Sequence, residues 1–167
     1  MKKHLLLAAT LAAAACGAQA QNTAASATLR DAQGQPAGQA SFTAGAQGLQ
    51  IKLEAERLSP GEHGFHVHEK GDCSAPDFSS AGGHFNPSSQ PHGDPTAGAH
   101  HVGDMPVLVA DASGKATARA ELRSMTIGGD GASDIVGKSV VVHADPDDFR
   151  TQPAGNSGAR VACGVIK

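Results

Sequence analysis

Histidine is the residue type that stands out in this chain, both in number and in position. The sequence holds nine histidines, and seven of them fall between residues 63 and 101. The neutral imidazole is the commonest metal-binding side chain, and it suits copper, zinc, iron and nickel. Such a dense cluster of imidazoles therefore predicts metal chemistry.

Two of these histidines alternate with apolar residues in the segment 64–69. Side chains two residues apart in a strand point to the same face, so His66 and His68 should share one face. Phe65 and Val67 should then point to the core. Two imidazoles on one rigid face provide half of a metal site. A His-x-His pair is a weak signal when it stands alone, because strand histidines are more often surface residues.

Further candidate ligands lie in a long segment rich in glycine, proline and serine. His84, His92, His101 and Asp104 follow one another at spacings of eight, nine and three. Zinc accepts mixed nitrogen and oxygen ligands in a tetrahedral arrangement. The alternative is a solvated polar loop, but such loops seldom order without a ligand or a crosslink. His143 ends an apolar run and adds a sixth imidazole.

Six imidazoles and one carboxylate exceed the needs of one tetrahedral site. They fit two metal ions if one imidazole is shared and gives one nitrogen to each ion. The spacing does not say which histidine is shared.

The rest of the chain is predicted to form strands that position these ligands. The segment 48–58 alternates Leu49, Ile51 and Leu53 with polar residues, which is typical of a half-buried strand. Glycine and proline separate the predicted strands. The strands are expected at 24–31, 39–45, 48–58, 64–69, 105–112, 115–122, 138–144 and 160–166.

Two irregular segments, 71–104 and 145–159, are too long to be turns. Loops of this length in a compact domain are usually functional or disordered. The expected fold is therefore all-β: an eight-stranded Greek-key β-barrel or sandwich, immunoglobulin-like, with two long functional loops.

The first 20 residues have the features of a signal peptide. Lys2 and Lys3 precede an apolar run, and Ala18-Gln19-Ala20 matches the small-x-small pattern of a cleavage site. The run is too short to cross a bilayer, which takes roughly 20 apolar residues. We expect residues 1–20 to be removed and 21–167 to form one domain. Lipid anchoring through Cys16 is the alternative.

Cysteine usage and charge narrow the class of protein further. Removal of the signal peptide leaves Cys73 and Cys163 as the one pair, and export places them where a disulfide persists. The formal net charge is −3, with no basic stripe for nucleic acid. No apolar run follows Ala20, so no membrane span is expected.

The chain resembles the copper–zinc superoxide dismutase family, in its bacterial periplasmic form. The motifs stand in the family's order and run from about residue 61 to the end. They are Gly64-Phe65-His66-Val67-His68, Gly83-His84-Phe85-Asn86-Pro87, His101-Val102-Gly103-Asp104, Val141-Val142-His143 and Gly155-Asn156-Ser157-Gly158-Ala159-Arg160-Val161-Ala162-Cys163-Gly164-Val165-Ile166.

The resemblance implies one copper and one zinc ion per subunit. The copper ligands would be His66, His68, His84 and His143. The zinc ligands would be His84, His92, His101 and Asp104. Asp147 and His63 would support the ligands from outside the coordination spheres, and Cys73 would pair with Cys163. His100 has no counterpart role, and we expect it to be exposed.

The implied function is conversion of superoxide to dioxygen and hydrogen peroxide by copper redox cycling, which would protect the cell envelope from superoxide. Arg160 would attract superoxide, and His84 would take a proton during turnover. The family's acidic and lysine cluster for steering superoxide is not visible, and Lys70 or Arg150 are the candidates to replace it. The protein would be periplasmic, as a homodimer or a monomer.

Three other functions share parts of this ligand set. A copper-delivery protein on the same barrel would lack a copper ligand or Arg160, and both are present. A zinc hydrolase needs an open coordination position, whereas the loop supplies four ligands. A copper-only dismutase would lack the zinc ligands of the loop.

Overall fold

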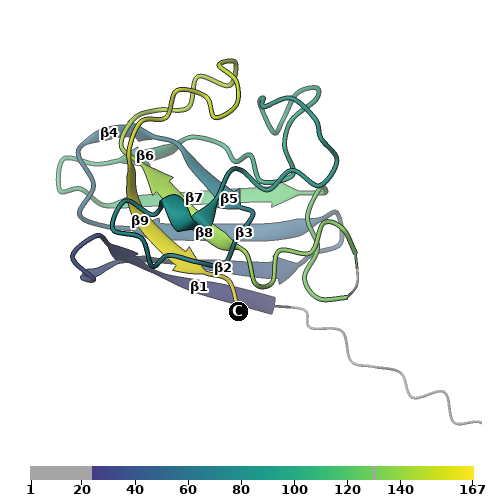
Figure 1. Ribbon diagram of the computed structural model, residues 1–167, viewed down its shortest axis with the longest axis horizontal. Coiled ribbons are helices and arrows are strands. Elements are labelled where there is room, and N and C mark those ends of the chain that lie inside the picture. The colour runs from purple at the N-terminus through teal and green to yellow at the C-terminus, as the bar shows by residue number, and fades with distance from the viewer. Residues whose placement is uncertain (1–23, 130) are drawn as a thin grey trace, which may run out of the picture.

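The chain folds into one antiparallel sheet of nine strands that curves into a nearly closed barrel (Figure 1). The computed structural model describes residues 24–129 and 131–167, so the expected signal peptide and Cys16 lie outside the described residues. The strands are β1 (Ala24–Asp31), β2 (Pro36–Ala44), β3 (Leu49–Ala55), β4 (Gly61–His63), β5 (Phe65–His68), β6 (Leu108–Ala110), β7 (Ala116–Leu122), β8 (Ser139–His143) and β9 (Arg160–Val165). Their order in the sheet is β4-β6-β7-β3-β2-β1-β9-β8-β5.

The all-β barrel predicted from the sequence is confirmed, but the strand count is nine instead of eight. The additional strand is β4, which pairs with β6, whereas β5 pairs with β8 at the opposite end of the sheet order. Gly64 alone separates β4 from β5. Its N–H donates to Asp145 O at 2.8 Å and its carbonyl accepts from His143 N at 2.9 Å. The chain therefore changes partners within one residue, which brings the two ends of the sheet together.

The core is aliphatic, with a few phenylalanines, as the composition predicts. Leu49, Ile51 and Leu53 of β3 are buried, and the polar residues between them are not. On β5, Phe65 and Val67 belong to the main apolar cluster, in agreement with the predicted alternation. Within 24–129 and 131–167, no helix has the length and apolarity that crossing a membrane requires.

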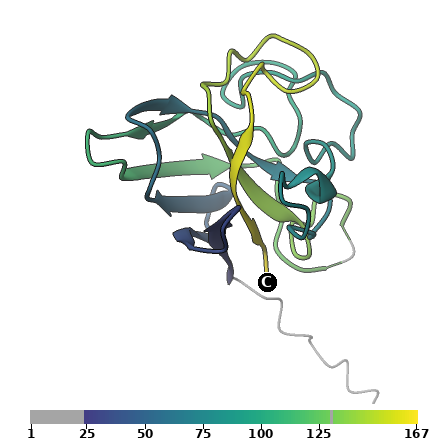
Figure 2. The same cartoon turned by 60° about the vertical axis from the view of Figure 1, so that its left-hand side comes forward.

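The two long loops, between β5 and β6 and between β8 and β9, extend from the same end of the barrel in both views (Figures 1 and 2). The first loop also pairs along β5. Val67 N donates to Gly103 O at 2.9 Å, and Val67 O accepts from Phe85 N at 2.8 Å. Gly103 permits this approach, because a Cβ there would collide with the Val67 carbonyl. The pairing sets His84 opposite His68, and Asp104 opposite His66.

The start of the first loop is crosslinked to β9. Cys73 and Cys163 form the predicted disulfide, with their Cα atoms 5.8 Å apart. The loop continues through the short 3₁₀ helix η1 (Ser79–Ala81). Next to the disulfide, the Phe78 side chain is buried in a small second apolar cluster with Cys163.

Candidate metal centre

Four buried histidines from three parts of the chain converge at the loop end of the barrel. His66 and His68 come from β5, His143 from the end of β8, and His84 from the first loop. One ring nitrogen of each lies within 4.8 Å of the others. His68 Nε2 and His143 Nε2 are 3.4 Å apart. We call these residues the four-histidine set.

A second group of donors lies within the first loop itself. His84, His92, His101 and Asp104 form this loop set, and all four are buried. Asp104 Oδ1 is 3.0 Å from both His84 Nδ1 and His92 Nδ1, and 3.3 Å from His101 Nδ1. Ligands about 2.0 Å from a tetrahedral zinc ion are about 3.3 Å from one another. The loop set therefore has the dimensions of a zinc site.

The other carboxylate oxygen of Asp104 is held by the backbone. Asp104 Oδ2 accepts from Gly93 N at 3.0 Å and from His101 N at 2.8 Å. These bonds leave Oδ1 directed at the three ring nitrogens.

His84 is the histidine that the two groups share. It belongs to both groups, and its Nδ1 lies against Asp104. Its ring stacks on His66 with the centroids 3.8 Å apart. The structure thus supplies what the spacing could not, namely which imidazole has one nitrogen available to each ion.

Hydrogen bonds on the outer side of the rings select which nitrogen keeps a lone pair. His66 Nε2 bonds Asp147 Oδ2 at 2.7 Å, and His68 Nδ1 donates to Gly82 O at 2.9 Å. In a neutral ring the opposite nitrogen then carries the lone pair. Burial is the main cause that lowers the pKa of His66 to about 4, that of His68 to about 2 and that of His143 to about 3. At neutral pH these rings are neutral and able to coordinate a metal.

Two atoms of these groups are buried without a hydrogen-bond partner. They are His66 Nδ1 and His84 Nε2, and both residues belong to the four-histidine set. A buried polar atom without a partner costs about 1–3 kcal/mol. A bound cation would satisfy both lone pairs. The residues present therefore fit a copper ion at the four-histidine set and a zinc ion at the loop set.

Asp147 connects the two groups from behind. Its Oδ2 bonds His66 Nε2, and its Oδ1 bonds His92 Nε2 at 2.9 Å. Burial acts to raise the pKa of Asp147, but these hydrogen bonds outweigh it and hold that pKa below its usual range. Gly155, with φ of 64°, lies against this link, and a Cβ there would be 2.6 Å from His92 Nε2.

The remaining sequence candidates lie outside both groups. His63 is buried, and its ring nitrogens are each 2.8 Å from a carbonyl oxygen, of His143 and of Ser59. It therefore contacts the backbone of His143 and belongs to neither donor group. His100 is half-buried where exposure was expected, and its Nδ1 donates to His101 O at 2.7 Å.

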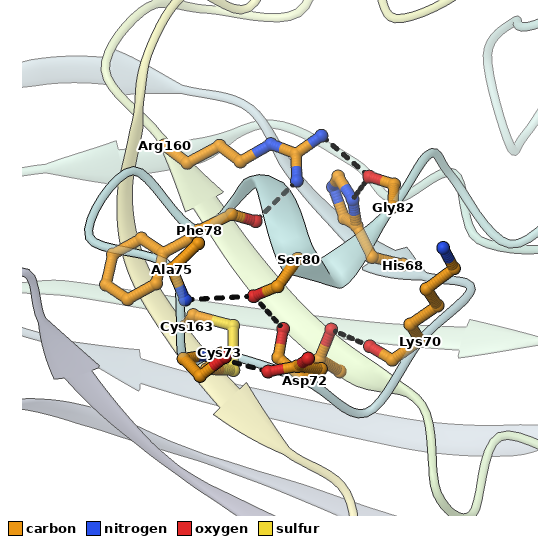
Figure 3. The surroundings of a disulfide bond; sticks show 12 residues. His68, Lys70, Asp72, Cys73, Ala75, Phe78, Ser80, Gly82, Arg160 and Cys163 are labelled. Carbon is orange, nitrogen blue, oxygen red and sulfur yellow. Dashed lines mark hydrogen bonds between the residues drawn. A yellow bond between two sulfur atoms is a disulfide. The ribbon is translucent and has the colours of Figure 1, made fainter.

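Arg160 lies at the cleft that leads to the four-histidine set. Its guanidinium donates to Phe78 O at 2.6 Å and to Gly82 O at 2.7 Å (Figure 3). Gly82 O also accepts from His68, so one carbonyl fixes both side chains. The cleft has a volume of about 310 Å³ and is lined by His68, Gly83, His84, Asn86, His101, His143, Pro153, Ala154 and Arg160.

The two candidates for steering superoxide do not line this cleft. Lys70 lines a neighbouring hollow with Lys138, and Arg150 is exposed on the second loop. Sequence reasoning also missed the carbonyl groups of Phe78 and Gly82. Backbone acceptors leave no residue-type signal, so only the fold reveals them.

Zinc binding at the loop set is expected to strengthen with pH. Burial acts to lower the pKa of His92, but the hydrogen bonds to Asp104 and Asp147 outweigh it and raise that pKa to about 9. Metal-free His92 is therefore protonated at neutral pH, and zinc must displace the proton on Nδ1. We expect the affinity to rise about tenfold per pH unit below that pKa. Chelator competition at several pH values measures this slope, and an affinity independent of pH would contradict it.

Comparisons with known proteins agree with this geometry. Residues 36–166 match the family model described as copper/zinc superoxide dismutase. A superoxide dismutase [Cu-Zn] of Caulobacter vibrioides is 45% identical over 148 residues, covering 86% of this chain and 85% of that protein. Superoxide dismutase [Cu-Zn] 1 of Aquifex aeolicus is 38% identical, covering 89% and 90% respectively.

Among solved structures, a SOD-like protein from Bacillus subtilis superimposes with a TM-score of 0.76 at 36% identity. The match covers 87% of this chain and 98% of that one. The family model, the sequence relatives and the fold all indicate the same family, and each donor group holds four candidate ligands. This chain belongs to the copper/zinc superoxide dismutase family, whose members are oxidoreductases that use copper and zinc to dismutate superoxide.

Proposed function

We propose that this chain performs the dismutation with copper held by the four-histidine set and zinc held by the loop set. The observation that carries the proposal is His84, which belongs to both groups and has its Nε2 buried without a partner. An imidazole with one nitrogen toward each group is suited to bridge two cations.

The reaction takes two superoxide anions and two protons to dioxygen and hydrogen peroxide. Bound copper supplies the one-electron redox chemistry. Arg160 supplies a permanent positive charge beside the cleft, which favours entry of an anion. When its Nε2 is not coordinated, His84 could hold a proton at that nitrogen and so supply one of the two protons that the reaction consumes.

Zinc does no redox chemistry. Its proposed role is to order the first loop through His92, His101 and Asp104, and thereby to fix the ring of His84. The four donors of the loop set leave no open position for hydrolytic chemistry.

We also propose that residues 1–20 are a signal peptide and that the mature protein works in the periplasm. The Cys73–Cys163 disulfide supports this location, because disulfides persist in oxidising compartments. Mass spectrometry of the protein secreted to the envelope tests the cleavage after Ala20, and would reveal a lipid on Cys16 instead.

The function is tested on wild-type protein purified from the envelope, with copper and zinc quantified beside dismutase activity. About one copper and one zinc ion per chain with activity would support the proposal. Two tightly bound metals without activity would indicate storage or delivery of copper. A protein that takes up no copper would overturn the assignment.

Arg160 provides a test of how the anion is attracted. We expect Arg160→Gln to lower the second-order rate constant for superoxide about tenfold and to weaken its dependence on salt, because the cleft loses its cation. Arg160→Lys keeps the charge but not the two-pronged contact to Phe78 O and Gly82 O, so its loss should be smaller.

The matched control is Arg119→Gln, since Arg119 is exposed on β7 and lines no part of the cleft. Rate constants measured at several ionic strengths separate the electrostatic attraction of superoxide, which depends on salt, from the chemical step, which does not. An Arg160→Gln variant with the rate and salt dependence of the control would rule out this role.

A further inference from the structure

The side chain of Gln152, in the second loop, makes paired contacts with the backbone of His92 in the first. Gln152 Oε1 accepts from His92 N at 2.9 Å, and Gln152 Nε2 donates to His92 O at 2.9 Å. The two residues are 60 positions apart in the sequence. We propose that this amide bridge, the Gln152 side chain on the His92 backbone, makes Gln152 a positioning residue that holds His92 for zinc.

The chemistry of the contact requires a primary amide. A primary amide offers one acceptor and one donor side by side, as a peptide group does, and so matches the N–H and C=O of His92. If the Gln152 amide were turned over, its NH₂ group would face the His92 N–H, and its oxygen would face the His92 carbonyl oxygen. A glutamate would still accept from the His92 N–H, but its second oxygen would face the His92 carbonyl with no proton between them.

The bridge is the sole support of the His92 main chain. Among the hydrogen bonds of the described residues, the N–H and C=O of His92 have Gln152 as their one partner. The ring of His92 is held by Asp104 and Asp147. His92 is buried, although Gln152 itself is exposed, so the loss of Gln152 would leave two backbone groups of His92 without their protein partners.

The second loop is stiff enough at this point to act as an anchor. Asp148 accepts from Arg150 N at 2.9 Å and from Thr151 N at 2.8 Å, and Gly155 N donates to Thr151 O at 2.7 Å. Gln152 therefore projects from a hydrogen-bonded turn. The residues that follow it, Pro153 and Ala154, line the cleft above the four-histidine set. The bridge thus ties the zinc side of the centre to the wall of the cleft.

This inference rests on the zinc assignment proposed above. The first test is the rate at which zinc leaves the copper- and zinc-loaded protein for a chromophoric chelator. Loss of a partner that supports a metal ligand from outside typically costs about 10–100-fold in affinity. We expect faster zinc release of about that size in Gln152→Ala and Gln152→Glu, with copper content unchanged.

The matched control is Gln90→Ala in the first loop. Gln90 is exposed, and its side-chain amide donates at 3.3 Å to Ser88 O, within its own loop.

Two further measurements distinguish the positioning of His92 from a general effect on stability. Cobalt placed in the zinc site should show altered visible bands in Gln152→Ala but not in Gln90→Ala. In the metal-free protein, the His92 amide should exchange its hydrogen faster in Gln152→Ala.

The outcomes separate the inference from the proposed function. Wild-type protein that binds no zinc would overturn the zinc assignment, and the inference with it. Wild-type protein that holds zinc, with Gln152 variants releasing it at the wild-type rate, would overturn the inference alone. Equal loss of zinc, copper and metal-free stability in Gln152→Ala would mean a general structural role and would also overturn it.

Discussion

His143→Ala is expected to abolish copper retention and dismutase activity while leaving zinc in place. The substitution removes the imidazole that closes the four-histidine set from β8, and Nε2 of His68 loses its neighbour at 3.4 Å. Substitution of a residue that only supports a metal ligand already lowers metal affinity or activity about 10–100-fold. Loss of the ligand itself should therefore reduce activity more than about 100-fold. The loop set does not include His143, so zinc should remain near one per chain.

Activity per chain, with both metals quantified, checks this expectation. His100→Gln is the matched control, because His100 belongs to neither donor group and should leave activity close to that of wild type. An active, copper-loaded His143→Ala variant would remove His143 from the copper site. Loss of both metals in equal measure would mean that the variant has lost its fold, and a thermal unfolding curve distinguishes that case.

Removal of the disulfide is expected to cause the largest loss of stability. Cys73 and Cys163 are 90 residues apart, so the crosslink restrains a large part of the unfolded chain. The double variant Cys73→Ser with Cys163→Ser should lose about 2–5 kcal/mol of unfolding free energy in the metal-free protein. Activity should also fall in folded, metal-loaded samples, because the crosslinked segment carries the Phe78 and Gly82 carbonyls that hold Arg160.

Urea unfolding of metal-free samples gives the change in stability, and wild type treated with a thiol reductant should reproduce the variant. Activity measured at a temperature well below the unfolding midpoint isolates the effect on Arg160. A variant as stable as wild type would contradict the stabilising role. Full activity in a folded, reduced sample would show that the Arg160 contacts survive without the crosslink.

Much of the fold and of the candidate centre was predictable, because it follows from local alternation. Leu49, Ile51 and Leu53 mark the buried face of β3, and Phe65 and Val67 mark the core face of β5. These patterns depend on neighbours two residues away and need no knowledge of the rest of the chain. The donor residues were predictable for a related reason, since few other functions require so many histidines.

The features that sequence reasoning missed depend on segments far apart in the chain. The split between β4 and β5 arises because Gly64 bonds His143, the last residue of β8, and Asp145 just after it, some 80 positions later. The resemblance implied that His84 is the shared imidazole, but the spacing alone did not, because its place in both donor groups depends on its pairing opposite His68. The role of Gln152 depends on two loops meeting 60 positions apart. None of these relations leaves a period or a spacing that a reader of the sequence could detect.

The pairing of the first loop along β5 has a consequence for solubility. Gly103 and Phe85 occupy the outward N–H and C=O of Val67, groups that would otherwise be open to another molecule. An uncovered strand of this kind is a template for intermolecular pairing and aggregation. If zinc orders the loop, zinc also keeps this strand covered. The metal content of a preparation would then decide how long it stays free of aggregates in storage, apart from any effect on catalysis.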